Sequence, residues 1–362
     1  MPCLIDGSQG EGGGQIIRTA LTLSLLTDRE VRIENIRARR RNPGLAPQHL
    51  TNVRALAELC GADLAGDQLG STRLQFKPQR WPRSGGYRFD VAQTAGRGSA
   101  GSVTLILQTL LLPLISTEQG ARLHLTGGTH VPWSPSAHYI SQVYLKILRQ
   151  LGIVSEMTIR HPGFYPRGGG KIDLAVEPVG VSTINGVPRY HFSSLDCCKQ
   201  PQLTAVRGTA LVCQLSHSIG LRMARQAEKD LLTAGIPADI KVVELSGPGP
   251  GAALCLQAQF DGMFAGFDAL GKKGLPAERV AEEATTALIE FISQDAPVDP
   301  YLADQLLLPL AMSNKPSRFR TAQVTSHFTT NAAVIEQMAN TQIHVEHGIG
   351  SDALITIAPD LA

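Results

Sequence analysis

This sequence of 362 residues contains few aromatic residues, and neither sign of charge is in clear excess. Phe, Trp and Tyr make up 5% of the chain, and 33 Lys and Arg residues stand against 31 Asp and Glu residues, for a net charge of +2. This near balance predicts no class of partner, so any anionic ligand must be held by a local basic patch. The contents of 43% hydrophobic and 18% charged residues exclude a disordered chain.

The sequence also lacks the patterns of export, membrane insertion and cysteine-based stabilisation. Its six cysteines are dispersed with no C-x-x-C pair, so neither a disulfide framework nor a structural zinc site is expected. The opening residues, MPCLID, lack the basic and apolar regions of a signal peptide. The longest apolar run, residues 103–115, is too short to span a bilayer. We expect a cytoplasmic protein with no membrane contact and no obligate protein partner.

A repeated order of elements is present instead: helix, strand, loop, helix, strand, strand. Unit one comprises residues 15–26, 30–36, 37–47, 48–60, 62–64 and 73–77. Unit two comprises residues 101–115, 122–125, 126–135, 136–151, 155–159 and 171–176. Unit three comprises helix 301–312, strand 320–325, helix 329–339 and strands 342–346 and 353–358. The repeat predicts α/β layers, with helices on one face of each small sheet.

The stretch between units two and three breaks this pattern. It contains strand-like residues 203–215, a helix at 218–234 and strands at 239–245 and 252–259, with a GPGPG loop at 247–251. We interpret it as a smaller inserted domain. The predicted domains are residues 1–183 for repeats one and two, 184–274 for the insertion, and 275–362 for repeat three.

Three short runs are candidates for chemistry. The first, GEGGGQ at residues 10–15, precedes the first helix, where converging backbone N–H groups favour anions. It is not a Walker A loop, because the Lys-Ser/Thr pair is missing. Glu11 would suit a hard cation such as Mg²⁺. The alternative is a glycine-rich turn with a solvated glutamate.

The second run, RARRR at residues 37–41, lies in the loop before the second helix of unit one. Clustered guanidinium groups suit bidentate phosphate recognition, although short arginine runs are often only solvated surface. The third run, TSHFTTN at residues 325–331, occupies the equivalent loop of unit three. His327 there would act as acid, base or nucleophile beside the helix at 329, or would be structural.

Together with other motifs, these runs resemble the RNA 3′-terminal phosphate cyclase family. The motifs are GEGGGQIIR (10–18), PGL (43–45) with QHL (48–50), GS (101–102) with LQ (107–108), GGT (127–129), GFYP (163–166) with GGG (168–170), and YLADQ (301–305). They follow one another in family order from residue 6 to residue 331 and so cover nearly the whole chain.

The resemblance implies an α/β (α+β) fold, with a large domain of three βαβαββ-type repeats and a smaller inserted α/β domain. It implies ATP-dependent conversion of an RNA 3′-phosphate into a 2′,3′-cyclic phosphodiester, with release of AMP and diphosphate. His327 matches the family's nucleophile, which carries AMP covalently. Glu11 would hold Mg²⁺ or Mn²⁺. The residues that would contact ATP or the phosphates of ATP and RNA are Arg18, Arg37, Arg40, Gln48, Gln108, Pro132, Tyr301, Asp304 and Gln305.

Two positions depart from the family pattern, and two other interpretations compete with it. Many relatives carry Asp or Asn where this chain has His130, and a small residue where it has Arg39; both departures concern the substrate more than the nucleophile. A cyclase-like ribosome-assembly factor shares the fold, but that branch lacks the nucleophilic histidine matched by His327. An enolpyruvyl-transferase-like enzyme also repeats an α/β unit, but it does not carry the turn at residues 163–170.

Overall fold

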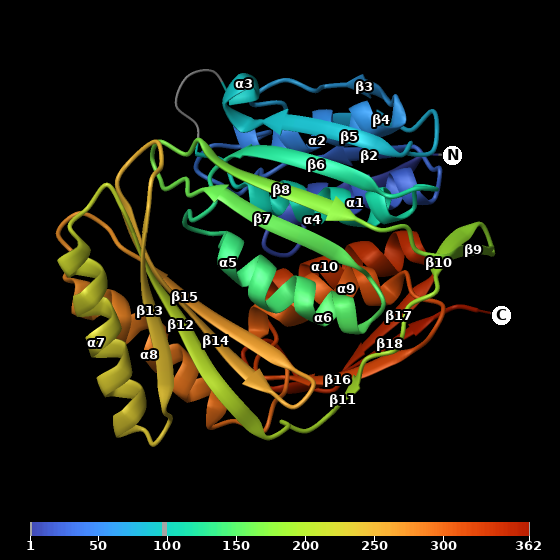
Figure 1. Cartoon of the computed structure of the whole chain (residues 1–362). Coiled ribbons are helices and arrows are strands. Elements are labelled where there is room, and N and C mark those ends of the chain that lie inside the picture. The colour runs from blue at the N-terminus through green and yellow to red at the C-terminus, as the bar shows by residue number, and fades with distance from the viewer. Residues whose placement is uncertain (1, 96–99, 362) are drawn as a thin grey trace.

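The computed structural model describes residues 2–95 and 100–361 and contains the same unit three times (Figure 1). Unit one consists of β1 (Cys3–Asp6), α1 (Gly14–Leu26), β2 (Val31–Glu34), α2 (Pro47–Cys60), β3 (Asp63–Ala65) and β4 (Leu74–Lys77). Unit two consists of β5 (Gly85–Asp90), α3 (Val91–Ala95), α4 (Val103–Ile115), β6 (Ala121–Gly127), α5 (Ala137–Tyr139), the π-helical η1 (Ile140–Tyr144), α6 (Leu145–Gln150), β7 (Ser155–His161) and β8 (Gly170–Val176). Unit three consists of β11 (Asp196–Cys197), α9 (Pro300–Ala311), β16 (Ser317–Thr321), α10 (Ser326–Ala339), β17 (Thr341–Val345) and β18 (Ala353–Pro359).

Strand pairing establishes that the three units are equivalent. The sheets have the orders β1-β2-β4-β3, β5-β6-β8-β7 and β11-β16-β18-β17. In each sheet the first pair is parallel and the other two pairs are antiparallel. The fold is therefore α/β with a βαβαββ repeat, as the resemblance implied. The residue patterns alone missed the leading strands β1, β5 and β11.

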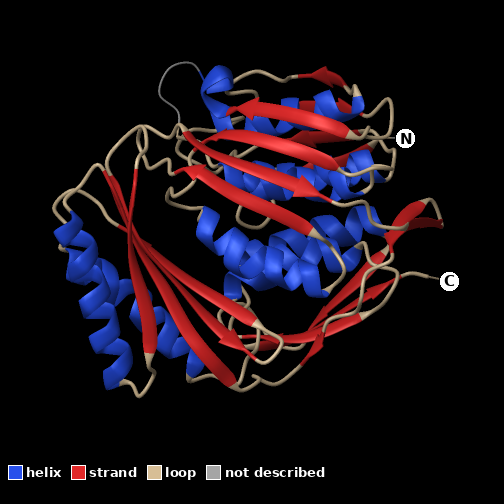
Figure 2. Ribbon diagram, in the orientation of Figure 1, coloured by secondary structure: helices blue, strands red, loops and turns tan. Residues whose placement is uncertain are grey.

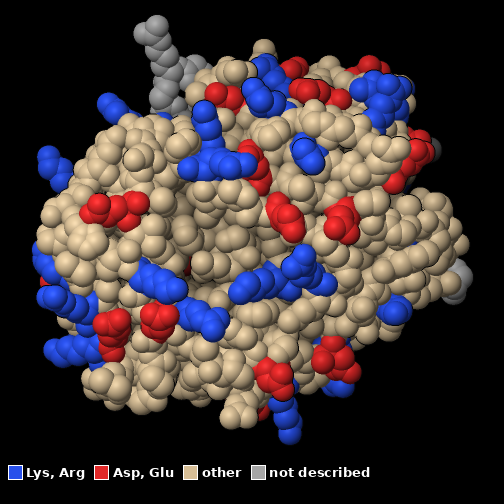
Figure 3. Space-filling model, in the orientation of Figure 1, with Lys and Arg blue, Asp and Glu red and all other residues tan. Residues whose placement is uncertain are grey.

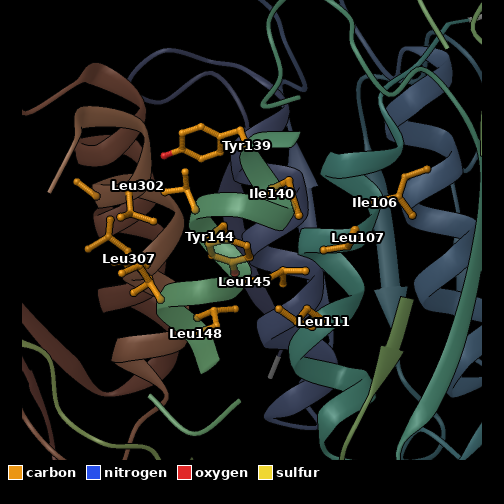
Figure 4. Packing of buried hydrophobic residues seen from close by; sticks show 14 of the residues in the cluster. Ile106, Leu107, Leu111, Tyr139, Ile140, Tyr144, Leu145, Leu148, Leu302 and Leu307 are labelled. Atoms are coloured by element: carbon orange, nitrogen blue, oxygen red, sulfur yellow. The ribbon is translucent and has the colours of Figure 1, made fainter. Parts of the chain in front are cut away.

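The helices of the three units pack against one another in the middle of the molecule, with the sheets outside them (Figure 2). Helices α1 and α4 are almost completely buried, as expected for central helices, and include polar residues such as Arg18 and Gln108. Figure 4 shows how α4, η1, α6 and α9 interdigitate, with Leu107, Tyr144 and Leu307 among the buried side chains. This packing fixes the ends of helices from different units relative to one another.

The inserted segment lies within unit three, between its first strand β11 and its first helix α9. It consists of β12 (Leu203–Cys213), α7 (His217–Thr233), β13 (Ala238–Leu245), β14 (Gly251–Phe260), β15 (Phe264–Leu270) and α8 (Ala277–Ile292). The sheet has the order β13-β12-β14-β15, and α7 and α8 pack together on one of its faces (Figure 1). The predicted limits, residues 184–274, include β11 and exclude α8, whereas β11 pairs with β16 and α8 packs against α7.

A two-stranded hairpin, β9 (Val181–Ile184) with β10 (Val187–Tyr190), links unit two to unit three. It carries the fully buried Arg189, whose guanidinium donates to the carbonyl oxygens of Ala311, Ala339 and Asn340. Those carbonyls lie near the ends of α9 and α10. Arg189 therefore ties the linker to the two helices of unit three.

The surface facing the viewer in Figure 3 is mixed in charge, with Lys and Arg side chains interspersed among Asp and Glu side chains. This agrees with the small net charge of +2. Among the described residues, no helix is both long enough and apolar enough to cross a membrane.

Candidate active site

The glycine-rich run forms the connection between β1 and α1 and is held against α10 of unit three. The backbone N–H of Glu11 donates to Thr330 Oγ1 over 3.1 Å. Gly10 has φ of +55°, and a Cβ at this position would lie 2.2 Å from the same oxygen. Only glycine meets both the left-handed conformation and the close approach. The glycine-rich turn of unit one and the first turns of α10 in unit three therefore lie in contact.

His327 lies in the first turn of α10, which begins at Ser326. The prediction that the helix starts at 329 was wrong by one turn. The Thr325 side chain caps the helix, accepting from the N–H of Phe328, and this cap signal extends the helix back over the histidine. Nε2 of His327 lies 2.9 Å from Glu11 Oε2. The side chain of His327 is 48% exposed, so the ring lies partly open to solvent.

Arg40, from the arginine-rich loop of unit one, also forms an ion pair with Glu11. One terminal nitrogen of Arg40 lies 3.0 Å from both the backbone oxygen and Oε2 of Glu11. Burial raises the pKa of Glu11, but the hydrogen bond and charge of His327 and the charges of Arg40 and Arg18 outweigh it, so the pKa lies below its usual range. The hydrogen bond that His327 donates to the Glu11 carboxylate raises the pKa of His327, against the opposing effect of burial. The pair favours imidazolium and carboxylate.

Buried Arg18 and half-buried Asp304 complete this cluster, and both line the adjoining pocket. Burial lowers the pKa of Arg18 to about 10, partly offset by the charges of Asp304 and Glu11. Burial likewise raises the pKa of Asp304, while His327, Asn331 and Arg18 act in the opposite direction. The site therefore places the basic side chains of Arg18, Arg40 and His327 around the acidic side chains of Glu11 and Asp304, an arrangement able to receive an anion.

Asn331 connects the three helices that carry these groups. Its side-chain nitrogen donates to Asp304 Oδ1 on α9 over 2.9 Å, and its oxygen accepts from Thr19 Oγ1 on α1 over 2.6 Å. Asn331 itself lies on α10 and is 1% exposed. An amide that is satisfied on both sides in this way fixes the relative rotation of α1, α9 and α10.

A pocket opens beside the cluster where α1, α4, η1, α9 and α10 converge. Four residues expected from the resemblance line it: Arg18, Gln108, Asp304 and Gln305. Nε2 of Gln108 donates to Oε1 of Gln305 over 2.6 Å, which links α4 to α9. The structure thus brings together Glu11, Arg18, Arg40, Gln108, Asp304, Gln305 and His327 from all three units. Their roles in binding and catalysis stay predictions.

The four remaining expected residues lie outside these contacts. Arg37 is turned into its own loop, where its guanidinium donates to the carbonyl oxygens of Asn42 and Gly44. Gln48 is half-buried at the start of α2, beside Gly101. Pro132 and Tyr301 are exposed, Pro132 in the connection after β6 and Tyr301 in the first turn of α9.

His49 is a member of the site that the residue patterns did not single out. It is 4% exposed, and a Cβ on Gly14 would lie 2.3 Å from its Nε2, so its ring packs on the glycine-rich turn. Burial and the charges of Arg37, Arg18 and Arg40 lower the pKa of His49 to about 3, so it is neutral. His49 stands next to Gln48 in the QHL motif, and this position could have indicated a place in the site. A motif does not show, however, whether a side chain is buried.

Comparisons with known proteins identify the family to which the chain is similar. The family described as RNA 3′-terminal phosphate cyclase matches residues 9–345. A protein of Gloeothece citriformis named RNA 3′-terminal phosphate cyclase is 44% identical over 98% of this chain and 98% of its own length. Proteins of that name from Methylococcus capsulatus (45% identical, 94% and 92% covered) and Pyrococcus furiosus (36% identical, 98% and 98% covered) also match.

Proposed function

Since the chain belongs to the RNA 3′-terminal phosphate cyclase family, we propose that it converts an RNA 3′-phosphate into a 2′,3′-cyclic phosphodiester using ATP. The observation that carries the proposal is the pairing of His327 Nε2 with Glu11 at 2.9 Å, next to Arg18, Arg40 and Asp304. A nucleophilic nitrogen beside cationic side chains suits attack on a phosphate.

In the first step, the Nε2 lone pair of His327 attacks the α-phosphorus of ATP. A P–N bond forms, the bond from this phosphorus to the bridging oxygen of the β-phosphate breaks, and diphosphate leaves. Nε2 must be unprotonated for this attack, whereas its hydrogen bond to Glu11 favours the protonated form. The Nε2 proton therefore passes to solvent, and the Glu11 carboxylate moves away from Nε2, before the attack.

The next two steps transfer the adenylate and close the ring. An oxygen of the RNA 3′-phosphate attacks the phosphorus of the adduct, the P–N bond breaks, and a phosphoanhydride joins RNA to AMP. The neighbouring 2′-OH then loses its proton and attacks the 3′-phosphorus, and AMP leaves with the anhydride oxygen. Because this hydroxyl is already tethered beside its target, the last step needs little assistance from side chains.

The residues that would receive the anionic groups follow from their positions. Helix α1 begins with Gly13 as N-cap, and no side chain of the described residues caps its first turn, so N–H groups there are free for phosphate oxygens. Arg18 and Arg40 would neutralise phosphate charge on either side of His327. Contacts of Pro132 and Tyr301 with the adenosine, and of Arg37, Gln48, Gln108 and Gln305 with phosphates, belong to the same proposal.

Glu11 would hold the divalent ion, Mg²⁺ or Mn²⁺. The residue fits the ion, because such ions are usually bound through one or two carboxylates together with substrate phosphates, and Glu11 presents a carboxylate that is 12% exposed beside His327. When bound, the ion would neutralise charge on the triphosphate and on the departing diphosphate.

The test is label transfer from α-labelled ATP to the purified protein, without RNA. We expect an adduct that is labile to acid and stable to alkali, as a P–N bond is, and cyclisation only of oligoribonucleotides that end in 3′-phosphate. His327→Ala should lose both the adduct and the cyclised product. His327→Asn, which keeps a polar side chain in the first turn of α10, should fold and also be inactive.

His344→Ala is the matched control, because His344 is an exposed histidine on β17, and this variant should form the adduct at the normal rate. Labelling of the His327→Ala protein, or cyclisation by the wild type without an adenylylated intermediate, would refute the mechanism. A dependence on one internal RNA sequence would refute recognition through phosphate and sugar alone.

A further inference from the structure

A second group of reactive side chains lies outside the active site, between unit two and the inserted sheet. Among the described residues, His130, His138 and Cys255 form the one group of metal-ligand type in which all three donor atoms lie within 4.8 Å of one another. His130 is 1% exposed, Cys255 is 1% exposed and His138 is half-buried. Two imidazoles and a thiol gathered in the interior have no role in the cyclase chemistry.

His130 is held in the orientation that a metal ligand needs. Its Nδ1 lies 2.8 Å from Thr129 Oγ1, and its Nε2 lies 2.8 Å from His138 Nδ1. The ring stacks on Phe164 at 5.3 Å between centroids, which prevents rotation. When Nδ1–H is donated to Thr129, Nε2 keeps its lone pair, and a second-shell hydrogen bond of this kind is typical of metal-bound histidine.

The inserted sheet supplies the opposite side. Cys255 on β14 is paired in register with Asp268 on β15, and the Asp268 carboxylate accepts hydrogen bonds from the Cys255 thiol and from Ser136. Ser136 caps α5, the short helix that carries His138. The donors therefore come from two different layers of the fold and meet at their contact.

We propose that His130, His138 and Cys255, with Asp268 as fourth ligand, form a zinc site that fastens the inserted sheet to unit two. Zinc bonds of about 2.0–2.1 Å to nitrogen and about 2.3 Å to sulfur place tetrahedral ligands roughly 3.3–3.7 Å apart. The donor atoms of His130, His138 and Cys255, all within 4.8 Å of one another, reach that spacing with shifts of about 1 Å. The Asp268 carboxylate, which now accepts from the Cys255 thiol, would turn toward the ion to complete the four ligands. Binding replaces the thiol proton of Cys255, which passes to solvent, and breaks the hydrogen bond between the two imidazoles.

The donor set distinguishes this site from the ion expected at Glu11. Nitrogen and sulfur ligands select zinc and related transition ions, whereas a lone carboxylate with phosphates suits Mg²⁺ or Mn²⁺. The proposed zinc site would serve stability rather than adenylyl transfer, because its ligands lie outside the His327 cluster.

The experiment uses the full-length protein, stripped with a chelator and titrated with zinc against a chromophoric competitor. We expect one ion per chain, a melting temperature that rises on loading, and, with Co²⁺ in place of zinc, a thiolate-to-cobalt charge-transfer band. Cys255→Ala should lose this band and bind zinc at least about a hundredfold more weakly, since it lacks a direct ligand. His130→Asn should weaken binding by at least about tenfold.

Cys213→Ala is the control, because Cys213 is an equally buried cysteine on the neighbouring strand β12, and it should keep the band and the affinity. Glu11→Ala should also keep zinc, which separates this site from the catalytic one. If the wild type shows no charge-transfer band, or if Cys255→Ala binds zinc as tightly as the wild type, the proposal fails. The wild-type measurement decides even if a variant does not fold.

Discussion

All three units contain a connection from the second strand to the second helix. In units one and three this connection lies beside Glu11, whereas in unit two it lies beside the inserted sheet. In unit one it carries Arg40, and in unit three it leads to His327; both side chains contact Glu11. In unit two the equivalent connection contains His130, whose ring lies close to Cys255 on the inserted sheet. The topology is the same, so the neighbour decides what each connection can do.

This difference separates the molecule into two junctions. The junction between units one and three, here called the catalytic junction, contains Glu11, Arg18, Arg40, Asp304 and His327. The junction between unit two and the insertion, here called the structural junction, contains His130, His138, Cys255 and Asp268. Substitutions at the first should change adenylylation more than folding, and substitutions at the second should do the reverse.

The largest effect is expected for Glu11→Ala at the catalytic junction. The loop carboxylate supports little of the core, so we expect a near-normal melting temperature and a loss of adenylylation of about a hundredfold or more, as for removal of other charge-stabilising groups. Higher divalent metal should recover part of the activity. Label transfer and thermal melting measure the two quantities. Simple unfolding of the variant would mean that Glu11 is structural.

The next effect comes from Gly10→Ala, which tests the contact between units one and three. The new Cβ would meet Thr330 Oγ1 at 2.2 Å in a left-handed conformation, whereas Gly70 has φ of +77° and nothing within 4 Å among the described residues. Both substitutions carry backbone strain of about 1–2 kcal/mol. Only Gly10→Ala should also lower adenylylation, by about tenfold, through displacement of the turn that carries Glu11. Equal behaviour of the two variants would show that the contact with α10 is unimportant.

Much of the fold could be predicted from the sequence, because helix periodicity is local. Helix α1 begins and α2 ends within one residue of the prediction. The short leading strands could not be predicted in this way: β11 consists of Asp196 and Cys197 and exists only because it pairs with β16. Strands this short show no alternation of polar and apolar residues, and the strands that they pair with lie in distant parts of the chain.

The site was predictable to the extent that it resides in motifs. The runs that contain Glu11 and His327 allowed either phosphate chemistry or a structural role, the family resemblance selected the first, and the structure brings the two residues together. Arg37 stands in such a run too, yet its side chain bonds to the carbonyls of its own loop. The His130 cluster gave no signal, because Cys255 is more than a hundred residues from His130 and His138 and meets them only when the inserted sheet packs on unit two.

A smaller effect is expected for Arg40→Ala at the rim of the catalytic junction. The side chain is 44% exposed, so solvent screens its charge and the loss should be near tenfold in adenylylation, with little change in stability. Arg39→Ala is the control, because Arg39 is exposed in the same run and has no contact with Glu11 among the described residues. An equal loss in both variants would point to the overall charge of the loop instead of the Arg40–Glu11 contact.

The smallest effect is expected for the pH dependence of the unfolding free energy at Asp299, which contacts both unit two and α9. Asp299 caps α9 through the N–H groups of Tyr301 and Leu302, and accepts from Tyr139 of unit two. Burial raises its pKa to about 6, even though these hydrogen bonds act in the opposite direction. Because the folded state keeps the proton to a higher pH than the unfolded state, stability is favoured below about pH 4 and falls as the pH rises to about 6. Neighbouring Asp268, with a pKa also near 6, contributes in the same direction.

Asp299→Asn removes the titration at Asp299 and keeps a capping oxygen for α9. The difference in unfolding free energy between wild type and variant should therefore move against the wild type as the pH rises from about 4 to about 6, by at most about 1.4 kcal/mol per pH unit, and stay constant above that. Denaturant titrations of both proteins across this range measure the difference. Asp268 titrates in both proteins, so its contribution cancels to first order. A difference that does not change with pH would mean that Asp299 is ionised throughout, and that the contact with Tyr139 holds unit two to α9 by geometry alone.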